Sequence, residues 1–136
     1  MPQLYTSGLV FINKNKILLA LSKNKNAFYL PGGKTNKNET SKQTLIREIK
    51  EELSCNLKEE NLKFYKHITA PAFGEKDNVI MEQDCFFYDG ELNIIPSAEI
   101  EKTEWFSKTE YLQQPNIAPG VMKLFELLEE DGLLIF

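Results

Sequence analysis

The chain has 136 residues, of which 42% are hydrophobic and 26% are charged. These values are ordinary for a globular protein with a single core, so we expect one domain over residues 1–136. A net charge of −4 without any basic block argues against a nucleic-acid polymer as partner. The N-terminus does not resemble a signal peptide and no apolar run reaches transmembrane length, which predicts a cytoplasmic protein without a membrane partner. Cys55 and Cys85 have no motif spacing and are expected to be free, buried thiols.

The N-terminal third reads as short apolar strands. Gly8–Ile12 and Ile17–Leu21 are bounded by Asn and Lys, which predicts a hairpin turned at residues 13–16. A third short apolar run, Ala27–Leu30, ends at the sequence Pro-Gly-Gly, and a polar loop over residues 34–39 follows.

The next segment has the period of a helix. Thr40 and Gln43 form a capping-box pattern, so the helix should begin near Ser41. At about 100° per residue, four apolar side chains fall on one arc about 100° wide. These form the predicted core face: Leu45, Ile46, Ile49 and Leu53.

Further strands are predicted at Phe64–Ala70, Asn78–Tyr88 and Glu99–Phe106, and a second helix opens at Pro119. The core stripe of that helix is Val121, Leu124, Phe125 and Leu128. The apolar tail GLLIF either docks as a strand or lies at a contact surface. Strands mixed with an early and a late helix predict an α+β or α/β sandwich of sheet and helices.

The first helix crowds three glutamates into one region. With Glu48 at zero and about 100° per residue, Glu52 falls near 40° and Glu51 near −60°. Leu45 lies near 60°, so Glu52 borders the apolar stripe instead of opposing it. Carboxylates at the rim of a core are partly desolvated and repel one another unless a cation lies between them. Hard divalent cations take oxygen ligands, which favours a metal site over a solvated acidic face.

Residues 33–55, GKTNKNETSKQTLIREIKEELSC, resemble the Nudix box, G-x5-E-x7-R-E-U-x-E-E-x-G-U with U aliphatic. The matching residues are Gly33, Glu39, Arg47, Glu48, Ile49, Glu51 and Glu52. Two positions depart from the pattern, because Ser54 replaces the glycine and Cys55 replaces an aliphatic residue. Serine fits a left-handed helix end poorly, so the helix is expected to end at Asn56 instead.

The resemblance implies a Nudix-type α/β/α sandwich with a mixed central sheet flanked by helices. It implies a hydrolase that uses Mg²⁺ or Mn²⁺ to cleave the diphosphate linkage of a nucleoside diphosphate joined to a group X. Glu48 and Glu52 would be the principal metal ligands, helped by the backbone carbonyl of Gly32. Metal ions would neutralise the phosphate charge and lower the pKa of a bound water.

The resemblance also gives roles to other residues of the pattern. Glu51 would be a further ligand or would polarise the attacking water, and Arg47 would orient the carboxylates through an ion pair with Glu51. Glu39 would serve a second metal or its waters. Glu99 precedes Trp105 by the interval at which some members carry an extra catalytic glutamate, although a surface glutamate at an edge strand is an alternative interpretation.

The sequence says less about the substrate. The predicted substrate contacts are Gly33, Lys34, Phe28 and Tyr29, with Phe73 as another aromatic that could stack on a base, although each aromatic could equally be core. Substrate choice is expected to reside in loops such as residues 72–77. His67 is expected to be a strand residue with a local hydrogen bond and not a catalyst.

Two substrate classes are open within this family. A (deoxy)nucleoside triphosphate is placed ahead of ADP-ribose or a nucleotide sugar, because small single-domain members more often resemble the MutT type. Pro71, which stands 16 residues after Cys55, is the feature that favours ADP-ribose. A homodimer is left open as the assembly. A catalytically inactive nucleotide-binding module is the alternative of another class, and its expected sign, a lost box glutamate, is absent from the sequence.

Overall fold

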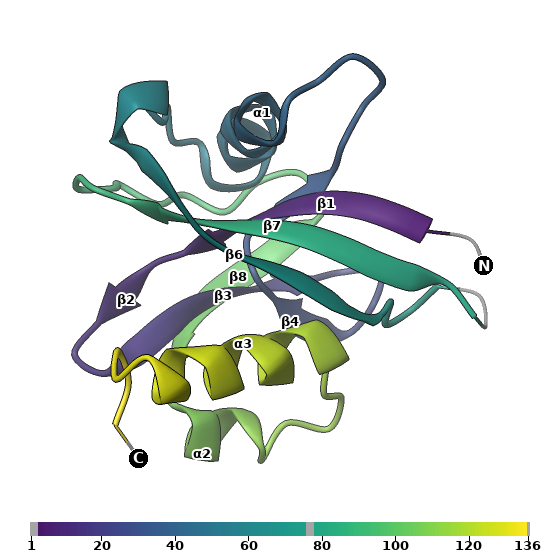
Figure 1. Ribbon diagram of the computed structural model, residues 1–136, viewed down its shortest axis with the longest axis vertical. Coiled ribbons are helices and arrows are strands. Elements are labelled where there is room, and N and C mark those ends of the chain that lie inside the picture. Colours follow the sequence, from purple (N-terminus) through teal and green to yellow (C-terminus); the bar gives the residue numbers. More distant parts are fainter. Residues whose placement is uncertain (1–2, 76–77, 136) are drawn as a thin grey trace.

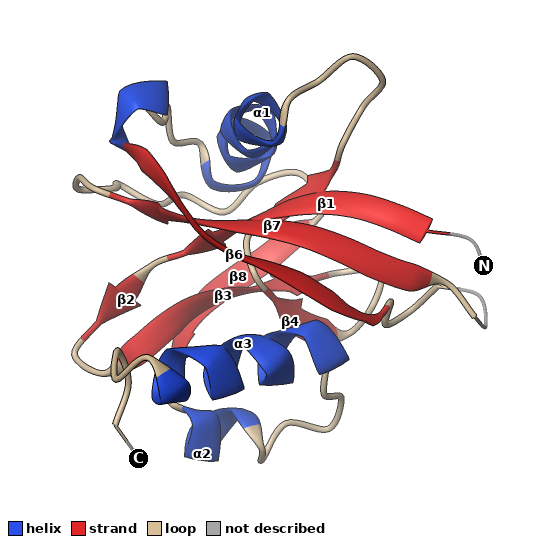
Figure 2. Cartoon of the chain, in the orientation of Figure 1, coloured by secondary structure: helices blue, strands red, loops and turns tan. Residues whose placement is uncertain are grey.

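The computed structural model describes residues 3–75 and 78–135 and has three layers, with α1 on one side of the strands and α2 and α3 on the other (Figures 1 and 2). In chain order its elements are β1 (Gln3–Val10), β2 (Ile12–Asn13), β3 (Lys16–Ser22), β4 (Ala27–Tyr29), β5 (Gly32–Lys34), α1 (Ser41–Leu53), η1 (Glu59–Asn61), β6 (Leu62–Pro71), β7 (Ile80–Tyr88), β8 (Ile100–Phe106), α2 (Lys108–Tyr111) and α3 (Pro119–Glu130). The expected α/β/α sandwich is therefore observed.

The first sheet is mixed and joins four strands in the order β5, β1, β7, β6. β1 runs antiparallel to β5 and parallel to β7, and β7 runs antiparallel to β6. Successive residues of a strand point to opposite faces, so β1 contributes Leu9 to the core beneath α1 and Val10 to the core beneath α3. Both faces of this sheet are thus covered.

The second sheet is antiparallel and centred on β3, which pairs with β2 and β4 and with β8. The predicted strand Gly8–Ile12 is divided between the two sheets, because β1 ends at Val10 and β2 begins at Ile12. The predicted turn is present. Its residues Lys14 and Asn15 have φ of 50° and 63°, the left-handed values that a two-residue hairpin loop requires.

Most of the other predicted strands keep their position with shifted ends. The two long strands are observed as β6 and β7, and Glu99 lies in the turn before β8 rather than in the strand. Three short elements were not predicted, namely β5, η1 and α2. The prediction also missed residues 3–7 of β1, where Leu4 and Tyr5 stand between polar residues and form no longer apolar run.

The core has one cluster on each side of the sheets. Beneath α1 the predicted residues Leu45, Ile49 and Leu53 are fully buried, and Ile46 is partly buried against the same cluster. Beneath α3 the predicted stripe is also buried. This packing fixes α1 against β1 and β5.

The apolar tail docks without forming a strand. Leu134 is buried in the core beneath α3, and the side chain of Asn15 hydrogen-bonds both to the N–H and to the carbonyl of Ile135. Cys55 and Cys85 are buried free thiols, as expected. Within residues 3–75 and 78–135, no helix combines the length and the apolarity that crossing a membrane would require.

Candidate active site

Two adjacent glycines let carboxylates from α1 reach the opposite side of the first sheet. β5 is the edge strand of that sheet, and the Gly32 N–H at this edge donates to Glu52 Oε1 at 3.0 Å. A Cβ at Gly33 would overlap the carboxyl group of Glu48, and a Cβ at Gly32, whose φ is +144°, would overlap the Ser7 carbonyl. Gly33 therefore leaves a gap that the Glu48 carboxyl group occupies, and Gly32 lets β5 approach β1 closely.

Both of these carboxylates are held in surroundings that disfavour their charge. The pKa of Glu52 is raised from 4.5 to about 8, mainly by burial. The Gly32 N–H acts against this rise, and the nearby carboxylates of Glu48, Glu51 and Glu99 add to it. Burial is also the main cause of a raised pKa at Glu48, where Arg47 acts in the opposite direction. A bound cation would remove this unfavourable energy.

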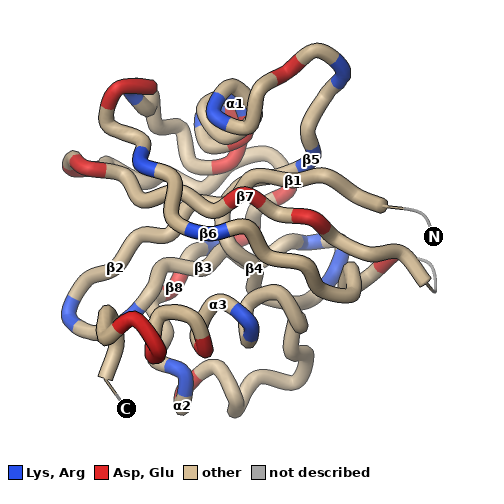
Figure 3. The backbone as a smooth tube through the Cα atoms, in the orientation of Figure 1, with Lys and Arg blue, Asp and Glu red and all other residues tan. Residues whose placement is uncertain are grey.

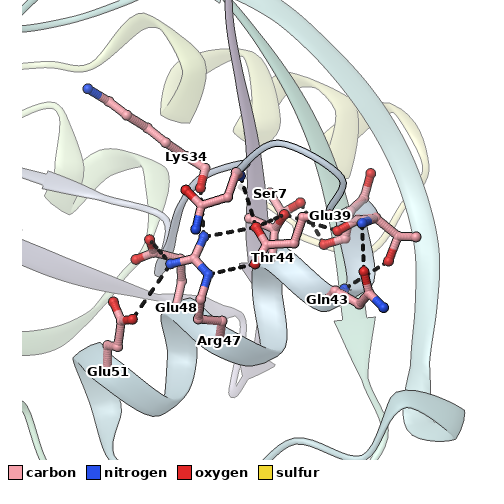
Figure 4. Close-up of polar contacts among 11 residues, drawn as sticks. Ser7, Lys34, Glu39, Gln43, Thr44, Arg47, Glu48 and Glu51 are labelled. Atoms are coloured by element: carbon pink, nitrogen blue, oxygen red, sulfur yellow. Dashed lines mark hydrogen bonds and ion pairs between the residues drawn. The ribbon is translucent and has the colours of Figure 1, made fainter.

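Arg47 connects the box residues in Figure 4. Its guanidinium donates to Glu39 Oε2 at 2.7 Å, to Glu48 Oε1 at 2.9 Å and to the Lys34 carbonyl at 2.9 Å. The ion pair with Glu51, one helical turn away, is present at 3.6 Å. Arg47 thus orients Glu48 from one side and ties α1 to β5.

Glu39 lies in the loop before α1, where its side chain is held by several hydrogen bonds. Its oxygens accept hydrogen bonds from two Arg47 nitrogens, the Asn36 N–H and the Thr44 hydroxyl, and the Arg47 bond is the main cause that lowers its pKa to about 2. It is also absent from the lining of the cleft described below. In this geometry Glu39 positions Arg47 and anchors the loop to α1, and its expected service to a second metal or its waters stays a prediction.

The ends of α1 are clearly defined. At the start, Thr40 and Gln43 form both hydrogen bonds of the predicted capping box. At the end, Ser54 adopts the left-handed conformation itself, with φ 58° and ψ 30°, and its N–H bonds to the Lys50 carbonyl. The expectation that helix termination shifts to Asn56 is therefore wrong, and the serine carries the strain that the family's glycine would avoid.

The carboxylates open into a cleft of about 370 Å³ between the two sheets. Its lining includes Gly32, Gly33, Glu48, Glu52 and Glu99. Apolar and aromatic groups line the rest, including Leu4, Tyr29, Phe73, Met81 and the start of α3 at Pro119. This size and mixture of lining groups are typical of a site for a small organic ligand.

Two lysines stand at this cleft. Lys34 Nζ lies 3.2 Å and Lys25 Nζ 3.5 Å from the same Glu75 oxygen, and Lys25 also lies over the Tyr29 ring, 5.5 Å from its centroid. Tyr29 stacks on Phe73 with ring centroids 6.0 Å apart. The cleft therefore holds cations that phosphate groups could use, with Glu75 as the carboxylate that now pairs with them.

Some predicted residues lie outside the cleft. Phe28 is buried, meets the Phe106 ring edge-on and does not line the cleft, which favours the alternative of a core residue; its contact with substrate stays a prediction. Glu51 is exposed and does not line the cleft, whereas Glu99 does. His67 is a β6 residue whose two ring nitrogens lie 2.7 Å from Asp84 and from Glu82, consistent with the non-catalytic expectation. Of the loop expected to govern substrate choice, residues 76–77 lie outside the described residues.

Other residues of the cleft were missed from sequence. Lys25, Glu75, Thr6 and Gln83 all contribute to its lining. Lys25 and Glu75 are 50 residues apart in the chain, so no local pattern relates them. Thr6 and Gln83 are aligned only by the parallel pairing of β1 with β7.

Comparison with known proteins identifies the family. The model of the NUDIX domain matches residues 1–128, which is most of the chain. This chain belongs to the Nudix hydrolases. No curated protein sequence matches it significantly.

Solved structures share this Nudix fold. The MutT protein of Methanosarcina mazei Go1 has a TM-score of 0.72 and 18% identity, with 96% of each chain covered. The NUDIX domain of Shewanella oneidensis NrtR, complexed with ADP ribose, has a TM-score of 0.68 and 20% identity, covering 96% of this chain and 89% of that one. A bifunctional NMN adenylyltransferase/ADP ribose pyrophosphatase of Francisella tularensis, complexed with AMP and a Mn ion, has a TM-score of 0.70 and 21% identity, covering 96% and 42%. At these identities the likeness shows the fold alone.

Nudix hydrolases generally depend on a divalent metal, and the donors of this cleft suit one. Glu48 and Glu52 supply hard oxygen ligands whose charge burial disfavours. Among the residues that the structure describes, no three His, Cys, Asp or Glu side chains converge closely enough to hold an ion by themselves. The remaining ligands would thus be backbone carbonyls, water or substrate phosphate, the mixture that Mg²⁺ commonly takes.

Proposed function

We propose that this Nudix hydrolase cleaves a (deoxy)nucleoside triphosphate to the monophosphate and pyrophosphate, using Mg²⁺ or Mn²⁺. The observation that carries this proposal is the pair of half-buried carboxylates, Glu48 and Glu52, that line the same cleft as the lysines and aromatic rings. The partner would be a small nucleotide, and we retain a cytoplasmic location as part of the proposal because both cysteines are free thiols.

Each residue of the cleft has a proposed role that follows from its position. Glu48 and Glu52, with the Gly32 carbonyl, would hold the metal, which when bound supplies charge neutralisation of the diphosphate. Arg47 keeps one Glu48 oxygen fixed, so the other oxygen is directed to the ligand. Lys34 and Lys25 would exchange their ion pairs with Glu75 for contacts with phosphate oxygens. Their positive charge would favour release of the pyrophosphate leaving group.

A base must take the proton of the attacking water. Glu99 is the better candidate because it lines the cleft and lies close enough to Glu52 to raise the pKa of that carboxyl, whereas Glu51 faces Arg47 outside the lining. Water attacks one phosphorus atom, its proton passes to the carboxylate, and the bridging oxygen departs with the leaving phosphate group.

One observation favours a second substrate class. Pro71, the residue that pointed to ADP-ribose, lines the cleft at the end of β6. Hydrolysis of ADP-ribose or a nucleotide sugar would use the same carboxylates and differ only in the group bound beside the diphosphate.

A hydrolysis screen separates these classes. Canonical and oxidised triphosphates are compared with ADP-ribose, dinucleoside polyphosphates and nucleotide sugars at fixed Mg²⁺, and kcat/KM is measured for each. The proposal expects a triphosphate to lead. A value for ADP-ribose tenfold above every triphosphate would contradict that order and make Pro71 the better guide. If the protein hydrolysed none of these compounds, the proposed activity itself would be contradicted.

A further inference from the structure

A polar pair lies in an otherwise apolar part of the cleft. Thr6 of β1 and Gln83 of β7 are paired neighbours in the parallel ladder, and both line the cleft. The preceding inward-facing positions of the same two strands are Leu4 and Met81, which are also paired and also line it. We call Thr6 and Gln83 the floor pair.

The floor pair has polar atoms away from solvent with unused hydrogen-bonding capacity. Thr6 Oγ1 is buried and has no hydrogen-bond partner among the described residues. Gln83 is only 8% exposed, and its amide lies over Gly8, whose missing side chain leaves room for it. The Gln83 Oε1 accepts only a weak bond from the Cys85 thiol, at 3.7 Å. Buried polar groups in native proteins are usually satisfied, so an unused pair in a binding cleft points to a ligand.

The chemistry of the pair suits the edge of a nucleobase. A glutamine amide offers one acceptor and two donors in a plane, and a threonine hydroxyl offers one donor and further acceptor capacity. Nucleobases present adjacent donors and acceptors on a flat edge and are read by this kind of side chain. Apolar neighbours such as Leu4, Met81 and Pro119 suit the faces of the ring.

The distance from the carboxylates fits the same ligand. Gly8 pairs with Gly32, whose N–H binds Glu52, so Gly8 marks the carboxylate end of β1. Thr6 is two residues along the strand, about 7 Å away, and Leu4 is about 13 Å away. A nucleotide whose phosphates lie at Glu52 would therefore place its sugar and base along the floor pair.

We propose that Thr6 and Gln83 recognise the nucleobase and set the preference of this enzyme among nucleotides. This inference rests on the proposed function in one respect, that the substrate is a nucleotide; it holds for a triphosphate and for ADP-ribose alike. Ordered water is the other occupant that could satisfy the pair.

The experiment uses two variants of matched shape, Thr6→Val and Gln83→Met. Thr69→Val, at an exposed position of β6 outside the cleft lining, is the control. Binding is measured by calorimetry with Mg²⁺ and non-hydrolysable nucleotide analogues of each base, and with inorganic tripolyphosphate, which lacks a base. Both floor variants should bind the preferred nucleotide about tenfold more weakly, the cost of one lost hydrogen bond. Gln83→Met should also flatten the ranking among bases. Binding of tripolyphosphate should not change, and Thr69→Val should leave both the affinity and the ranking as in the wild type.

Thermal unfolding without ligand gives a second, independent readout. Thr6→Val removes an unsatisfied hydroxyl, so it should raise the melting temperature by about 3 °C while it weakens nucleotide binding. A residue that only supports the fold, or that bonds a structural water, would lower the melting temperature when replaced. That result, or wild-type affinity and ranking in both variants, would overturn the inference. A wild-type protein that binds tripolyphosphate but no nucleotide would instead contradict the proposed function, and the inference with it.

Discussion

Replacing Glu52 by glutamine should stabilise the metal-free protein above neutral pH. The pKa of Glu52 is about 8 in the folded chain, against 4.5 for an ordinary glutamate. Between these values the folded state binds a proton more tightly than the unfolded state, so the free energy of unfolding falls as pH rises. The slope is about 1.4 kcal/mol per pH unit, which gives up to about 3 kcal/mol lost at pH 7 and about 5 kcal/mol above pH 8.

The Glu52→Gln variant has no such titration. In a chelating buffer at pH 8 its melting temperature should exceed that of the wild type by on the order of 10 °C. At pH 4.5, where Glu52 is protonated in the folded state and half protonated in the unfolded state, the difference should nearly vanish. Saturating Mg²⁺ should raise the melting temperature of the wild type and have little effect on the variant. Glu51→Gln, at an exposed position of the same helix, is the matched control and should preserve most of the pH dependence of the wild type, because burial is the main cause of the raised Glu52 pKa and Glu51 a minor one. A Glu52→Gln protein that melts below the wild type at pH 8 would refute the reasoning.

Four further outcomes are expected. With Mg²⁺, Glu48→Gln should reduce kcat by at least about a hundredfold while the circular dichroism spectrum is unchanged, and near-normal turnover would remove Glu48 from the site. Gly33→Ala should lower kcat because its Cβ would displace the Glu48 carboxyl group, and an unchanged rate would show that the gap is not needed. Ser54→Gly should raise the free energy of unfolding, measured by urea titration, by about 0.5–1 kcal/mol, whereas Asn56→Gly should not raise it. A stabilisation by Asn56→Gly and none by Ser54→Gly would contradict the observed helix end. Hydrogen bonds to Asp84, the larger cause, and to Glu82 raise the pKa of His67 above 6.5. The contribution of His67 to the free energy of unfolding should therefore be full below pH 6.5 and lost as pH rises through the raised pKa. A stability difference between the wild type and His67→Asn that is constant from pH 6 to 9 would oppose this.

The sequence predicted what local spacing determines. The capping box, the core face of α1 and the crowding of Glu48, Glu51 and Glu52 all depend on residues within one helix. The consequence that Glu52 is partly desolvated also followed, because its position beside Leu45 depends only on the helical period. The burial of the stripe Val121, Leu124, Phe125 and Leu128 followed in the same way.

The errors arose where strand register or backbone conformation decides. Phe28 and Tyr29 are consecutive in β4, so they point to opposite faces and only one can face the cleft; sequence alone did not say which. The floor pair depends on β1 lying beside β7, across 77 residues of chain. At Ser54 the general rule against left-handed serine was outweighed by the packing of Leu53 and Cys55 on either side, both of which are buried.

The central claim is that Glu48 and Glu52 bind a divalent metal inside the cleft. The most direct test is a Mn²⁺ titration followed by electron paramagnetic resonance, which counts free Mn²⁺, with the wild type and the double variant Glu48→Gln/Glu52→Gln. The account predicts that the wild type removes Mn²⁺ from solution at its tightest site and that the folded double variant does not. Equal affinity and stoichiometry in the two proteins would contradict it.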